Sequence, residues 1–590
     1  MLLLGACSAG NAAGQGAAKA PAGDTIAFVH VNVVPMNREG FLKDQTVRVL
    51  NGKIAQVGPS GTFTLPLDTR AIEARGKFLI PGLTDTHVHL QTSLEFPVFL
   101  ANGVTTVFNL DGHPAHLLWR KEIAAGEMQG PTIFTTGPIF TRPHTPEEAV
   151  RMVDEQAALG YDGVKIYNGV SKEAYPSLIA EAKRKNLLLM GHVARKPDFE
   201  LTLASGQSIA HLEEYTYTFF NPLRDNNNSH IVYDETKIQE AVGFTVKAGI
   251  FVIATLHNYA EIVQQATDLD GFLRNPNLRY DAPWVQEHFQ PANNGYKNGF
   301  TPEEYPRIRT SLAFQRKLLK ALADGGVPLL CGTDASTVGP VAGFGVHDEL
   351  QEFVNDGLTP FQALQTATTN PARYFRQSEH TGTIEAGKRA DLVLLAGNPL
   401  ENIANTRKIE GIVLQGKWIE GQTLSAGLQR VPEEYRARIE EMKTLLQKNP
   451  ERANALDVQV DPYGELAASA LEQLAEGQDF KVLEATLRRL HEKRPDSSLV
   501  AERALNTLGY QLLGKQKYPA AIAVLRLNTE YNPKSANSWD SLAEAVYKSG
   551  DLPGGIAYYK KALEVDAGYG NANAARKFIS EHEVPPAAHD

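Results

Sequence analysis

From about residue 78 to residue 370, apolar segments alternate regularly with amphipathic ones, and this alternation constrains the fold more than any other feature. Parallel strands need crossover connections, which are usually helices. Thr145 and Glu148 form the capping box expected at the start of one such helix. The eight apolar segments that we assign as strands are 78–87, 103–110, 131–138, 163–169, 187–193, 207–213, 250–256 and 327–336. Eight β-then-α units predict an α/β protein whose residues 78–379 form a (β/α)8 TIM barrel.

Strand-rich segments flank the predicted barrel on both sides, at residues 25–77 and 380–424. Asn51-Gly52 between two apolar runs is typical of a tight hairpin turn. Because a lone hairpin is only marginally stable, we expect the two segments to join in one small flanking β-sandwich.

A long insertion separates the seventh and eighth predicted strands, at about residues 258–310. Loops of this length between regular elements are usually either disordered or functional. The many aromatic residues of this segment favour an ordered lid over the site.

Beyond residue 428 the pattern becomes helical and repeats with a period of 34 residues. Leu508-Gly509, Ala521, Leu525 and Pro533 fall opposite Leu542-Ala543, Gly555, Tyr559 and Ala567. This spacing resembles tetratricopeptide repeats, so we expect residues 428–590 to form an all-α helical-repeat domain. So few repeats bury little surface by themselves, and we expect them to pack on the barrel, on a protein partner or on a second copy of the chain.

The composition excludes several classes of protein. The net charge of −10 and the pI of about 5.9 argue against a nucleic-acid partner, because phosphate contacts need a basic face. After the first few residues no run of 18 apolar residues occurs, so no membrane-spanning helix is expected. Cys7 and Cys331 are the only cysteines, which leaves no basis for a disulfide framework.

The N-terminus contains a separate signal. Leu4-Gly5-Ala6 directly precedes Cys7, and an Ala- and Gly-rich stretch follows. This resembles the cleavage box of bacterial lipoproteins, in which the cysteine becomes the lipidated first residue. Residues 1–24 are therefore expected to be a signal remnant and flexible tether, with a lipid anchor through Cys7 that places the protein in the cell envelope, facing the periplasm. The positively charged start of a signal peptide is missing, so a cytoplasmic location is the alternative.

Ionisable residues stand at the ends of several predicted strands. His87 and His89 alternate at the end of the first strand and should point to the same face. In a barrel of this kind the chemistry lies at the C-terminal ends of the strands. The other such residues are Lys165, His192, His211 and Asp334 on the fourth, fifth, sixth and eighth strands. Because a buried unpaired ammonium is unfavourable, Lys165 in an apolar strand indicates a function, and the six residues together predict a metal site.

The order H-x-H, Lys, His, His, Asp resembles the metal-dependent amidohydrolase superfamily over about residues 25–425. The segments GLTPFQALQTATTNPARYF (357–375) and GTIEAGKRADLVLLAGNP (382–399) add to the resemblance. It is similar to the branch of imidazolonepropionase-like hydrolases and amidohydrolase-type Xaa-Pro or Xaa-Arg dipeptidases. The resemblance implies an enzyme that hydrolyses carbon–nitrogen bonds.

The same resemblance implies roles for the six residues. Lys165 would be carbamylated by CO2 and bridge two divalent metal ions. His87, His89 and Asp334 would bind the first ion, and His192 and His211 the second. A hydroxide between the ions would be the nucleophile, and Asp334 would transfer its proton to the leaving amine. Zinc is expected, with manganese and cobalt as alternatives.

Two further residues are candidates for contacts with the substrate. Tyr167 lies two residues beyond Lys165 and should share its face, where it could donate to a developing oxyanion or simply pack. His257 ends the seventh predicted strand, where the superfamily often places substrate-contacting groups.

The sequence therefore favours a binuclear hydrolase of an amide, peptide or cyclic amide, with a short peptide, dipeptide-like or N-acyl amino-acid substrate. One alternative is a mononuclear hydrolase of the imidazolonepropionase or deaminase type, which would need no bridging lysine. Another is a catalytically inactive barrel whose helical repeats make the protein a peptide-binding scaffold.

Overall fold

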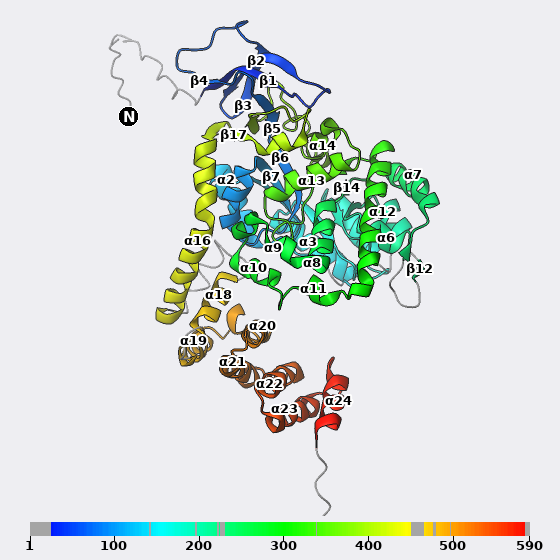
Figure 1. The fold of residues 1–590 in the computed structure, drawn as a ribbon, viewed down its shortest axis with the longest axis vertical. Helices are drawn as coiled ribbons and strands as arrows, with labels where there is room; N and C mark the ends of the chain where they lie inside the picture. Colours follow the sequence, from blue (N-terminus) through cyan, green and yellow to red (C-terminus); the bar gives the residue numbers. More distant parts are fainter. Residues whose placement is uncertain are drawn as a thin grey trace, which may run out of the picture.

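The structure is a computed structural model. It describes residues 25–140, 143–194, 198–220, 223–224, 231–337, 339–449, 465–475, 480–495 and 497–583. Figure 1 shows a strand-rich part at one end, a mixed α/β body in the middle and a string of helices at the other end. The predicted mixed α/β class with a C-terminal helical part is confirmed.

A mixed sheet forms the strand-rich end. Its eight strands are β1 (Ile26–Val33), β2 (Leu42–Leu50), β3 (Lys53–Pro59), β4 (Arg70–Glu73), β5 (Phe78–Pro81), β16 (Leu392–Leu395), β17 (Ile409–Leu414) and β18 (Lys417–Glu420). Their order is β18-β17-β16-β5-β1-β2-β3, and β4 pairs with β1. The predicted hairpin is confirmed, because Leu50 pairs with Lys53 and Asn51 and Gly52 both adopt positive φ angles, of 49° and 76°.

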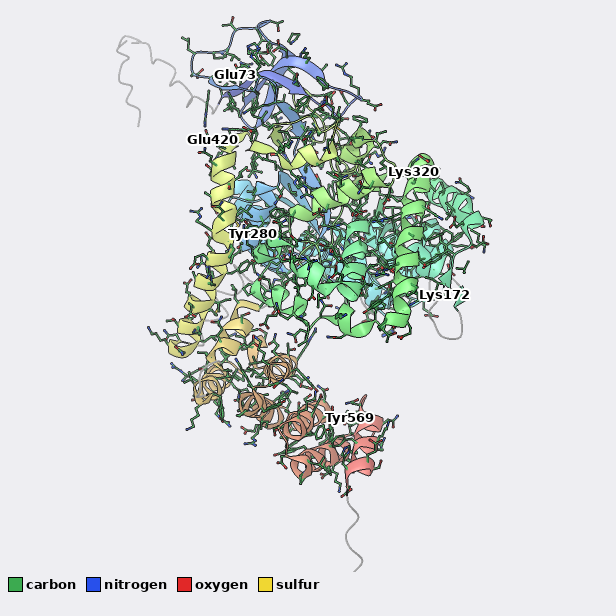
Figure 2. All side chains as sticks on the ribbon, viewed as in Figure 1. Glu73, Lys172, Tyr280, Lys320, Glu420 and Tyr569 are labelled. Carbon is green, nitrogen blue, oxygen red and sulfur yellow. The ribbon has the colours of Figure 1, made fainter. Side chains whose placement is uncertain are left out.

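This sheet differs from the predicted β-sandwich. β5 pairs in parallel with β1 and antiparallel with β16, so hydrogen bonding continues from one chain segment to the other in a single sheet. Apolar side chains of both segments, such as Phe28 and Leu394, share one buried core. An ion pair between Arg70 of β4 and Glu420 at the end of β18, both exposed, also connects the segments; Figure 2 labels Glu420.

Eight short parallel strands form the central body. Three make one sheet, β6 (Leu83–Val88), β7 (Val104–Asn109) and β8 (Thr132–Thr135). Five make the other, β9 (Gly163–Ile166), β10 (Leu188–Gly191), β11 (Ser208–Ala210), β14 (Val252–Ile253) and β15 (Leu329–Leu330). Parallel bridges join Thr136 to Gly163 and Val88 to Ala335, at both junctions between the sheets. Each predicted strand segment overlaps one of these strands, and the closed (β/α)8 barrel stays a prediction.

The first predicted strand, 78–87, is wrong in one respect, because the structure divides it at Gly82. Phe78–Pro81 joins the flanking sheet, and Leu83–Val88 pairs with β7 in the body. A Cβ atom on residue 82 would lie 2.0 Å from Oγ1 of Thr105, so the close approach of β7 requires glycine here. The chain thus passes directly from one sheet to the other.

Helices connect the strands of the body. They are α1 (Phe96–Ala101), α2 (Pro114–Ala125), α3 (Pro146–Leu159), α4 (Tyr175–Arg184), α5 (Phe199–Ala204), α6 (Glu213–Thr218), α7 (Ile238–Ala248), α8 (Leu256–Thr267), α12 (Tyr305–Asp324), α13 (Phe344–Asn355), α14 (Pro360–Thr366) and α15 (Thr369–Tyr374). Short 3-10 helices are η1 (Ser93–Glu95), η2 (Glu235–Lys237) and η5 (Ile403–Arg407), and β12 (Leu223–Arg224) pairs with β13 (Ile231–Val232). At the start of α3 Thr145 accepts a hydrogen bond from the Glu148 amide, as expected, but the Glu148 carboxylate accepts from the His144 amide, one residue before the position that the predicted capping box requires.

The long insertion is ordered and helical. After α8 it contains α9 (Leu269–Leu273), η3 (Pro276–Tyr280), α10 (Pro283–Phe289), α11 (Gly295–Gly299) and η4 (Pro302–Glu304). Its aromatic residues are largely buried: Phe272, Trp284 and Phe289 belong to the main core.

The C-terminal region is helical and packs on the body through its first part. It comprises α16 (Gly421–Lys448), α18 (Glu465–Leu474), α19 (Lys481–Lys493), η7 (Ser498–Val500), α20 (Glu502–Gly514), α21 (Tyr518–Tyr531), α22 (Ala536–Lys548), α23 (Leu552–Val565) and α24 (Ala572–His582). The hydroxyl of Tyr435 on α16 lies 3.1 Å from that of Thr92, and Lys515 bridges Glu287 of α10 and Glu472 of α18. The assignment to tetratricopeptide repeats stays a prediction.

Residues 1–24, including Cys7, lie outside the described residues, so the structure does not test the lipid anchor. Within the described part of the chain, no helix combines the length and apolar character needed to span a bilayer.

Candidate metal centre

The six predicted ligands come from the ends of five strands. His87 lies in β6, Lys165 in β9, and His89, His192 and His211 directly follow β6, β10 and β11. Asp334 lies a few residues beyond β15. Because neighbouring parallel strands end at the same edge, the local alternation of strand residues and the parallel order together bring these side chains to one place.

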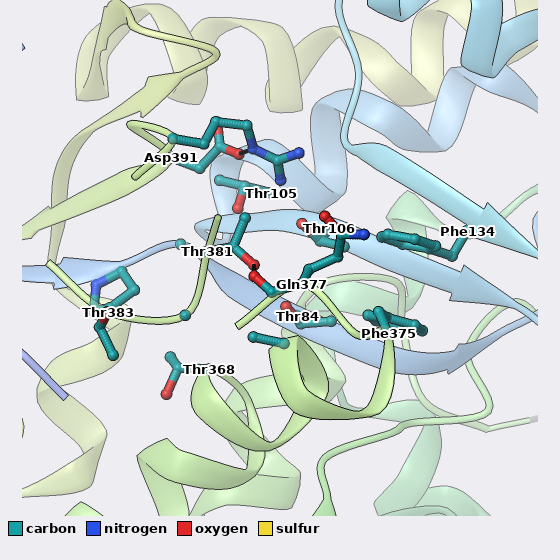
Figure 3. A pocket seen from close by; sticks show the side chains of 15 residues that line it. Thr84, Thr105, Thr106, Phe134, Thr368, Phe375, Gln377, Thr381, Thr383 and Asp391 are labelled. Carbon is teal, nitrogen blue, oxygen red and sulfur yellow. Dashed lines mark hydrogen bonds and ion pairs between the residues drawn. The ribbon is translucent and has the colours of Figure 1, made fainter. Parts of the chain in front are cut away.

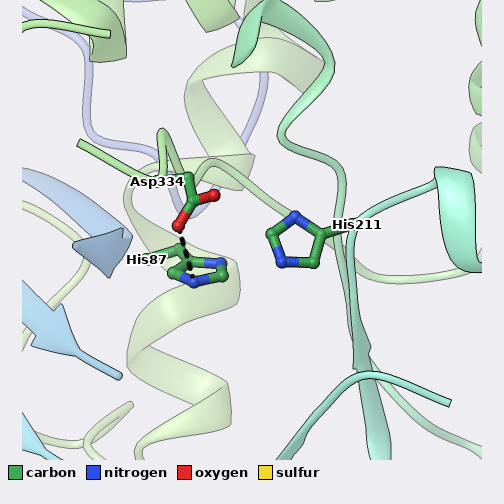
Figure 4. A group of neighbouring side chains, drawn as sticks. All are labelled: His87, His211 and Asp334. Carbon is green, nitrogen blue, oxygen red and sulfur yellow. Dashed lines mark ion pairs between the residues drawn. The ribbon is translucent and has the colours of Figure 1, made fainter. Parts of the chain in front are cut away.

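Asp334 lies at the middle of the cluster. Its Oδ1 atom lies 3.1 Å from Nε2 of His87 and 3.0 Å from Nε2 of His89. Nζ of Lys165 lies 3.2 Å from the same His87 nitrogen. Figure 4 shows His87, His211 and Asp334 converging, and one ligand atom of each lies within 4.8 Å of the others.

The histidine rings form a continuous series across the cluster. The ring centroid of His87 lies 5.3 Å from that of His89 and 4.8 Å from that of His211. The His211 centroid lies 4.7 Å from that of His192. The structure therefore brings all six predicted side chains together; their role as ligands remains a proposal.

Three residues that the sequence analysis missed hold members of the cluster. Glu214 lies 2.9 Å from Nδ1 of His192, and the Thr255 hydroxyl lies 2.8 Å from Nδ1 of His211. The side-chain amide of Asn258 donates to Oδ2 of Asp334 over 3.0 Å. A partner on Nδ1 fixes the ring and leaves Nε2 directed to the site. The acidic pair after His211 was the available signal for Glu214; nothing comparable marked Thr255.

Burial sets the protonation states at the centre. It lowers the pKa of His87 and His211 well below the usual value, so both imidazoles are neutral. Burial alone would raise the pKa of Asp334, but His87 and His89 hold it well below its usual range. Burial lowers the pKa of Lys165 to about 8. The cluster therefore combines neutral imidazoles, a carboxylate and an amine that loses its proton easily.

This donor set fits a divalent cation. Neutral imidazole nitrogens and a carboxylate oxygen are the ligand types that zinc, manganese and cobalt accept. Among the described residues Nδ1 of His87 is buried and has no hydrogen-bond partner, so the polar contacts of this ring are those of Nε2 with Asp334 and Lys165. A cation bound by the Nε2 atoms and by Oδ1 of Asp334 would offset the repulsion among these closely spaced lone pairs.

The two predicted substrate residues occupy different surroundings. Tyr167 is 38% exposed, and its ring centroid lies 4.4 Å from that of His192, at the edge of the cluster. His257 does not end a strand, because β14 stops at Ile253 and His257 lies in α8. Its Nε2 atom lies 3.3 Å from Glu261 and 3.9 Å from Asp348. The neighbouring Asn258, rather than His257, contacts Asp334.

Glu349 holds the start of α8 in place. Its carboxylate oxygens accept hydrogen bonds from the backbone amides of Leu256, at 3.0 Å, and His257, at 2.7 Å. Burial raises the pKa of Glu349 to about 8. Although burial alone would lower the pKa of His257, Glu261 and nearby acids raise it to about 9. This buried group fixes the turn of α8 that carries Asn258.

Comparison with known proteins relates the chain to one family. The model of the amidohydrolase family matches residues 78–419. An adenine deaminase of Ruegeria pomeroyi is 28% identical over 375 residues, which cover 60% of this chain and 51% of that protein. An ochratoxinase of Aspergillus niger is 23% identical over 314 residues, which cover 52% and 62% of the two chains. The chain spans about half the length of the adenine deaminases that it matches.

Solved structures share the fold. The bottromycin amidohydrolase superposes with a TM-score of 0.56 and 22% identity, covering 70% of this chain and 91% of that one. A Xaa-Pro dipeptidase with methionine bound in its active site gives a TM-score of 0.52 and 18% identity, covering 67% of this chain and 100% of that one. At these identities the likeness concerns the fold alone.

Proposed function

Because the chain belongs to the amidohydrolase family, we propose that it hydrolyses carbon–nitrogen bonds and uses two divalent metal ions to cleave dipeptide-like or N-acyl amino-acid substrates. The observation that carries the proposal is the position of Lys165. Its side chain is only 1% exposed, and Nζ lies 3.2 Å from Nε2 of a metal-ligand candidate, His87. An ammonium group in this place would repel any cation bound by the histidines.

Carbamylation removes that conflict. With the pKa of Lys165 lowered to about 8, about a tenth of the amine is unprotonated at pH 7, far more than for an ordinary lysine. The lone pair of Nζ would bond to the carbon of CO2, and one proton would leave to solvent. The product would be an anionic carbamate, which would supply oxygen ligands to the cations. His87, His89 and Asp334 would hold one ion, and His192 and His211 the other.

The bound ions would polarise the scissile carbonyl and lower the pKa of the attacking water. Asp334 would accept the proton of that water and pass it to the leaving nitrogen; in support, one carboxylate oxygen faces the histidines while Asn258 orients the other. Glu214 and Thr255 keep the rings of His192 and His211 in position. Tyr167, beside His192, is the candidate donor to the oxyanion.

A mononuclear deaminase-type hydrolase is the second candidate, and the 28% identity to an adenine deaminase favours it. Lys165 argues against it, because a single cation needs no bridging group. The choice of dipeptide-like or N-acyl amino-acid substrates rests on the motif resemblance described above.

The test compares Lys165→Ala with Lys172→Ala, a control at an exposed lysine a few residues farther along the chain. Intact mass spectrometry near neutral pH should find the added mass of one CO2 in the wild type and in Lys172→Ala but not in Lys165→Ala. A panel of dipeptides, N-acyl amino acids and adenine should show activity on the first two classes that Lys165→Ala abolishes. Deamination of adenine that survives Lys165→Ala would favour the mononuclear candidate.

Two proposals concern the ends of the chain. We propose that Cys7 carries a lipid anchor in the cell envelope, and that the C-terminal helices, as tetratricopeptide-like repeats, bind a partner or a second copy. When cells that express either protein are fractionated, the wild type should be found in the membrane fraction and Cys7→Ala in the soluble fraction. Removal of α22–α24 should reduce any self-association seen by light scattering.

A further inference from the structure

A second concave site lies at the opposite end of the strands from the candidate metal centre. A cleft of about 310 Å³ is lined by residues at or just before the starts of β10, β11 and β14, including Ser208 and Phe251. The ligand candidates His192 and His211 follow the other ends of β10 and β11. We call this hollow the basal cleft.

The basal cleft is lined by three cations and by no acidic residue. The cations are Lys183 at the end of α4 and Arg373 and Arg376 in and after α15. None of the three forms an ion pair with the residues that the structure describes. Lys183 also lines an adjoining hollow that contains Glu200, but no ion pair joins the two. In a chain of net charge −10, such a concave cluster of unpaired positive charge concentrates anions.

Local contacts hold the cationic groups in place. Nη1 of Arg376 donates to the backbone oxygen of Asn186 at 3.1 Å and also to the Asn186 side chain. The guanidinium carbon of Arg373 lies 5.1 Å from the ring centroid of Phe251. The buried Ser208 hydroxyl accepts from the Phe251 amide at 3.2 Å, so its own proton remains to be donated. The guanidinium groups keep most of their N–H donors for a ligand.

The backbone at the cleft supports a site built around Arg376. Both Arg376 and its partner Asn186 have φ angles of 59°, in the left-handed region that favours glycine. Arg376 follows the last turn of α15, where glycine is the usual residue. A long cationic side chain in this strained position is consistent with a role for that side chain.

In a neighbouring hollow the positive charge of the lining is paired with an acidic side chain. Figure 3 shows it, lined by threonines such as Thr84, Thr105 and Thr106. Its cation, Arg389, forms an ion pair with Asp391 in the same lining. Because this charge is compensated, the threonine-lined hollow offers no net attraction to anions, in contrast to the basal cleft.

We propose that the basal cleft binds a phosphoryl group, either as free phosphate or in the headgroup of an anionic lipid. Guanidinium groups match the geometry of phosphate and bind it through paired N–H donors. Three positive charges match the double negative charge of free phosphate, and a singly charged lipid phosphodiester would rely on the paired N–H contacts. This site is separate from the proposed hydrolytic centre and does not depend on it.

The experiment measures binding of inorganic phosphate to the full-length, metal-loaded protein by calorimetry at constant ionic strength. The double substitution Arg373→Gln/Arg376→Gln should weaken one class of phosphate sites by at least about tenfold, because it removes two charge-assisted contacts. Arg309→Gln is the control, since Arg309 is exposed on α12 and has no described ion pair. Phosphate bound at the metal centre would be unaffected by all of these substitutions. If the double variant does not fold, Lys183→Gln, at the exposed end of α4, replaces it as the test variant and should also weaken phosphate binding.

A second arm distinguishes the two sources of the phosphoryl group. Cosedimentation uses vesicles of phosphatidylglycerol, with phosphatidylcholine vesicles as the neutral comparison. Binding of phosphate alone supports a soluble ligand, and binding of phosphatidylglycerol vesicles that the double variant loses supports a lipid headgroup. If neither phosphate nor vesicles bind in a way that Arg373 and Arg376 control, the proposal is overturned.

Discussion

Asn258 donates a hydrogen bond from its side-chain amide to Oδ2 of Asp334 over 3.0 Å, while Oδ1 of the same carboxylate faces His87 and His89. The two oxygens of Asp334 are thus held in different surroundings. The amide fixes the plane of the carboxylate, and that plane decides where a proton can be accepted.

Replacement of Asn258 by Leu should therefore lower kcat by about 10- to 100-fold, since groups that orient a ligand at a metal site have effects of this size. Metal content should stay unchanged, because Asn258 is not a ligand. Steady-state kinetics with metal analysis of the same samples provides the measurement. Asn298→Leu, an exposed asparagine in the insertion, is the control and should behave as wild type. Equal kcat values in the two variants would contradict this role.

Glu214→Gln should weaken metal binding by about 10- to 100-fold, because the carboxylate beside Nδ1 of His192 fixes the ring and strengthens it as a ligand. Competition with a chromogenic chelator gives the affinity. Glu200→Gln, at an exposed position in α5, is the matched control. If Glu214→Gln holds its metal as tightly as Glu200→Gln, the contact does not serve the metal centre.

The pH dependence of stability should reveal Glu349. Its pKa rises from 4.5 to about 8 in the folded protein, so the folded state binds the proton more tightly than the unfolded state does. This contribution to the free energy of unfolding is complete below about pH 4.5 and is lost as the pH rises toward 8. Glu349→Gln should therefore show a smaller loss of Tm between pH 5 and pH 8 than the wild type.

Glu352→Gln is the control for that experiment, since Glu352 lies near Glu349 but pairs with Arg316 at the surface. It should keep the wild-type slope of Tm against pH. Equal slopes of Tm against pH for all three proteins would mean that the titration of Glu349 does not cause this pH dependence of stability.

Gly82→Ala should destabilise the protein by about 1–3 kcal/mol, the usual effect of forcing extra volume into a packed site. The added Cβ would lie 2.0 Å from Oγ1 of Thr105. Denaturant unfolding measures the change, and Thr105→Ala in the same chain should recover part of it. Gly295→Ala is the control, because a Cβ on residue 295 meets no atom within 4 Å. A Gly82→Ala protein as stable as this control would show that β7 can move away.

The sequence predicted the parts of the site that local periodicity determines. His87 and His89 alternate along a strand, so their common face follows from the strand geometry alone. The sequence could not predict that Asn258, rather than His257, contacts Asp334. β14 ends at Ile253, and Thr255 takes a left-handed backbone conformation, with φ of 46°, that turns the chain into α8. An apolar run such as IFVIATL (250–256) gives no sign of that turn.

The sequence also could not predict contacts between residues that lie far apart along the chain. Either Glu213 or Glu214 could have reached His192, and only the packing of α6 selects Glu214. Likewise the apolar run Phe78–Leu83 looks continuous, although Thr105 and Gly82 divide it between two sheets. In both cases the deciding partner lies more than 20 residues away.

The measurement that tests the central proposal most directly is the metal content of protein purified without chelators, for the wild type and Lys165→Ala. The proposed binuclear centre predicts about two equivalents of divalent metal per chain in the wild type, and at most one in the variant. One equivalent in both proteins, with activity retained in Lys165→Ala, would contradict it.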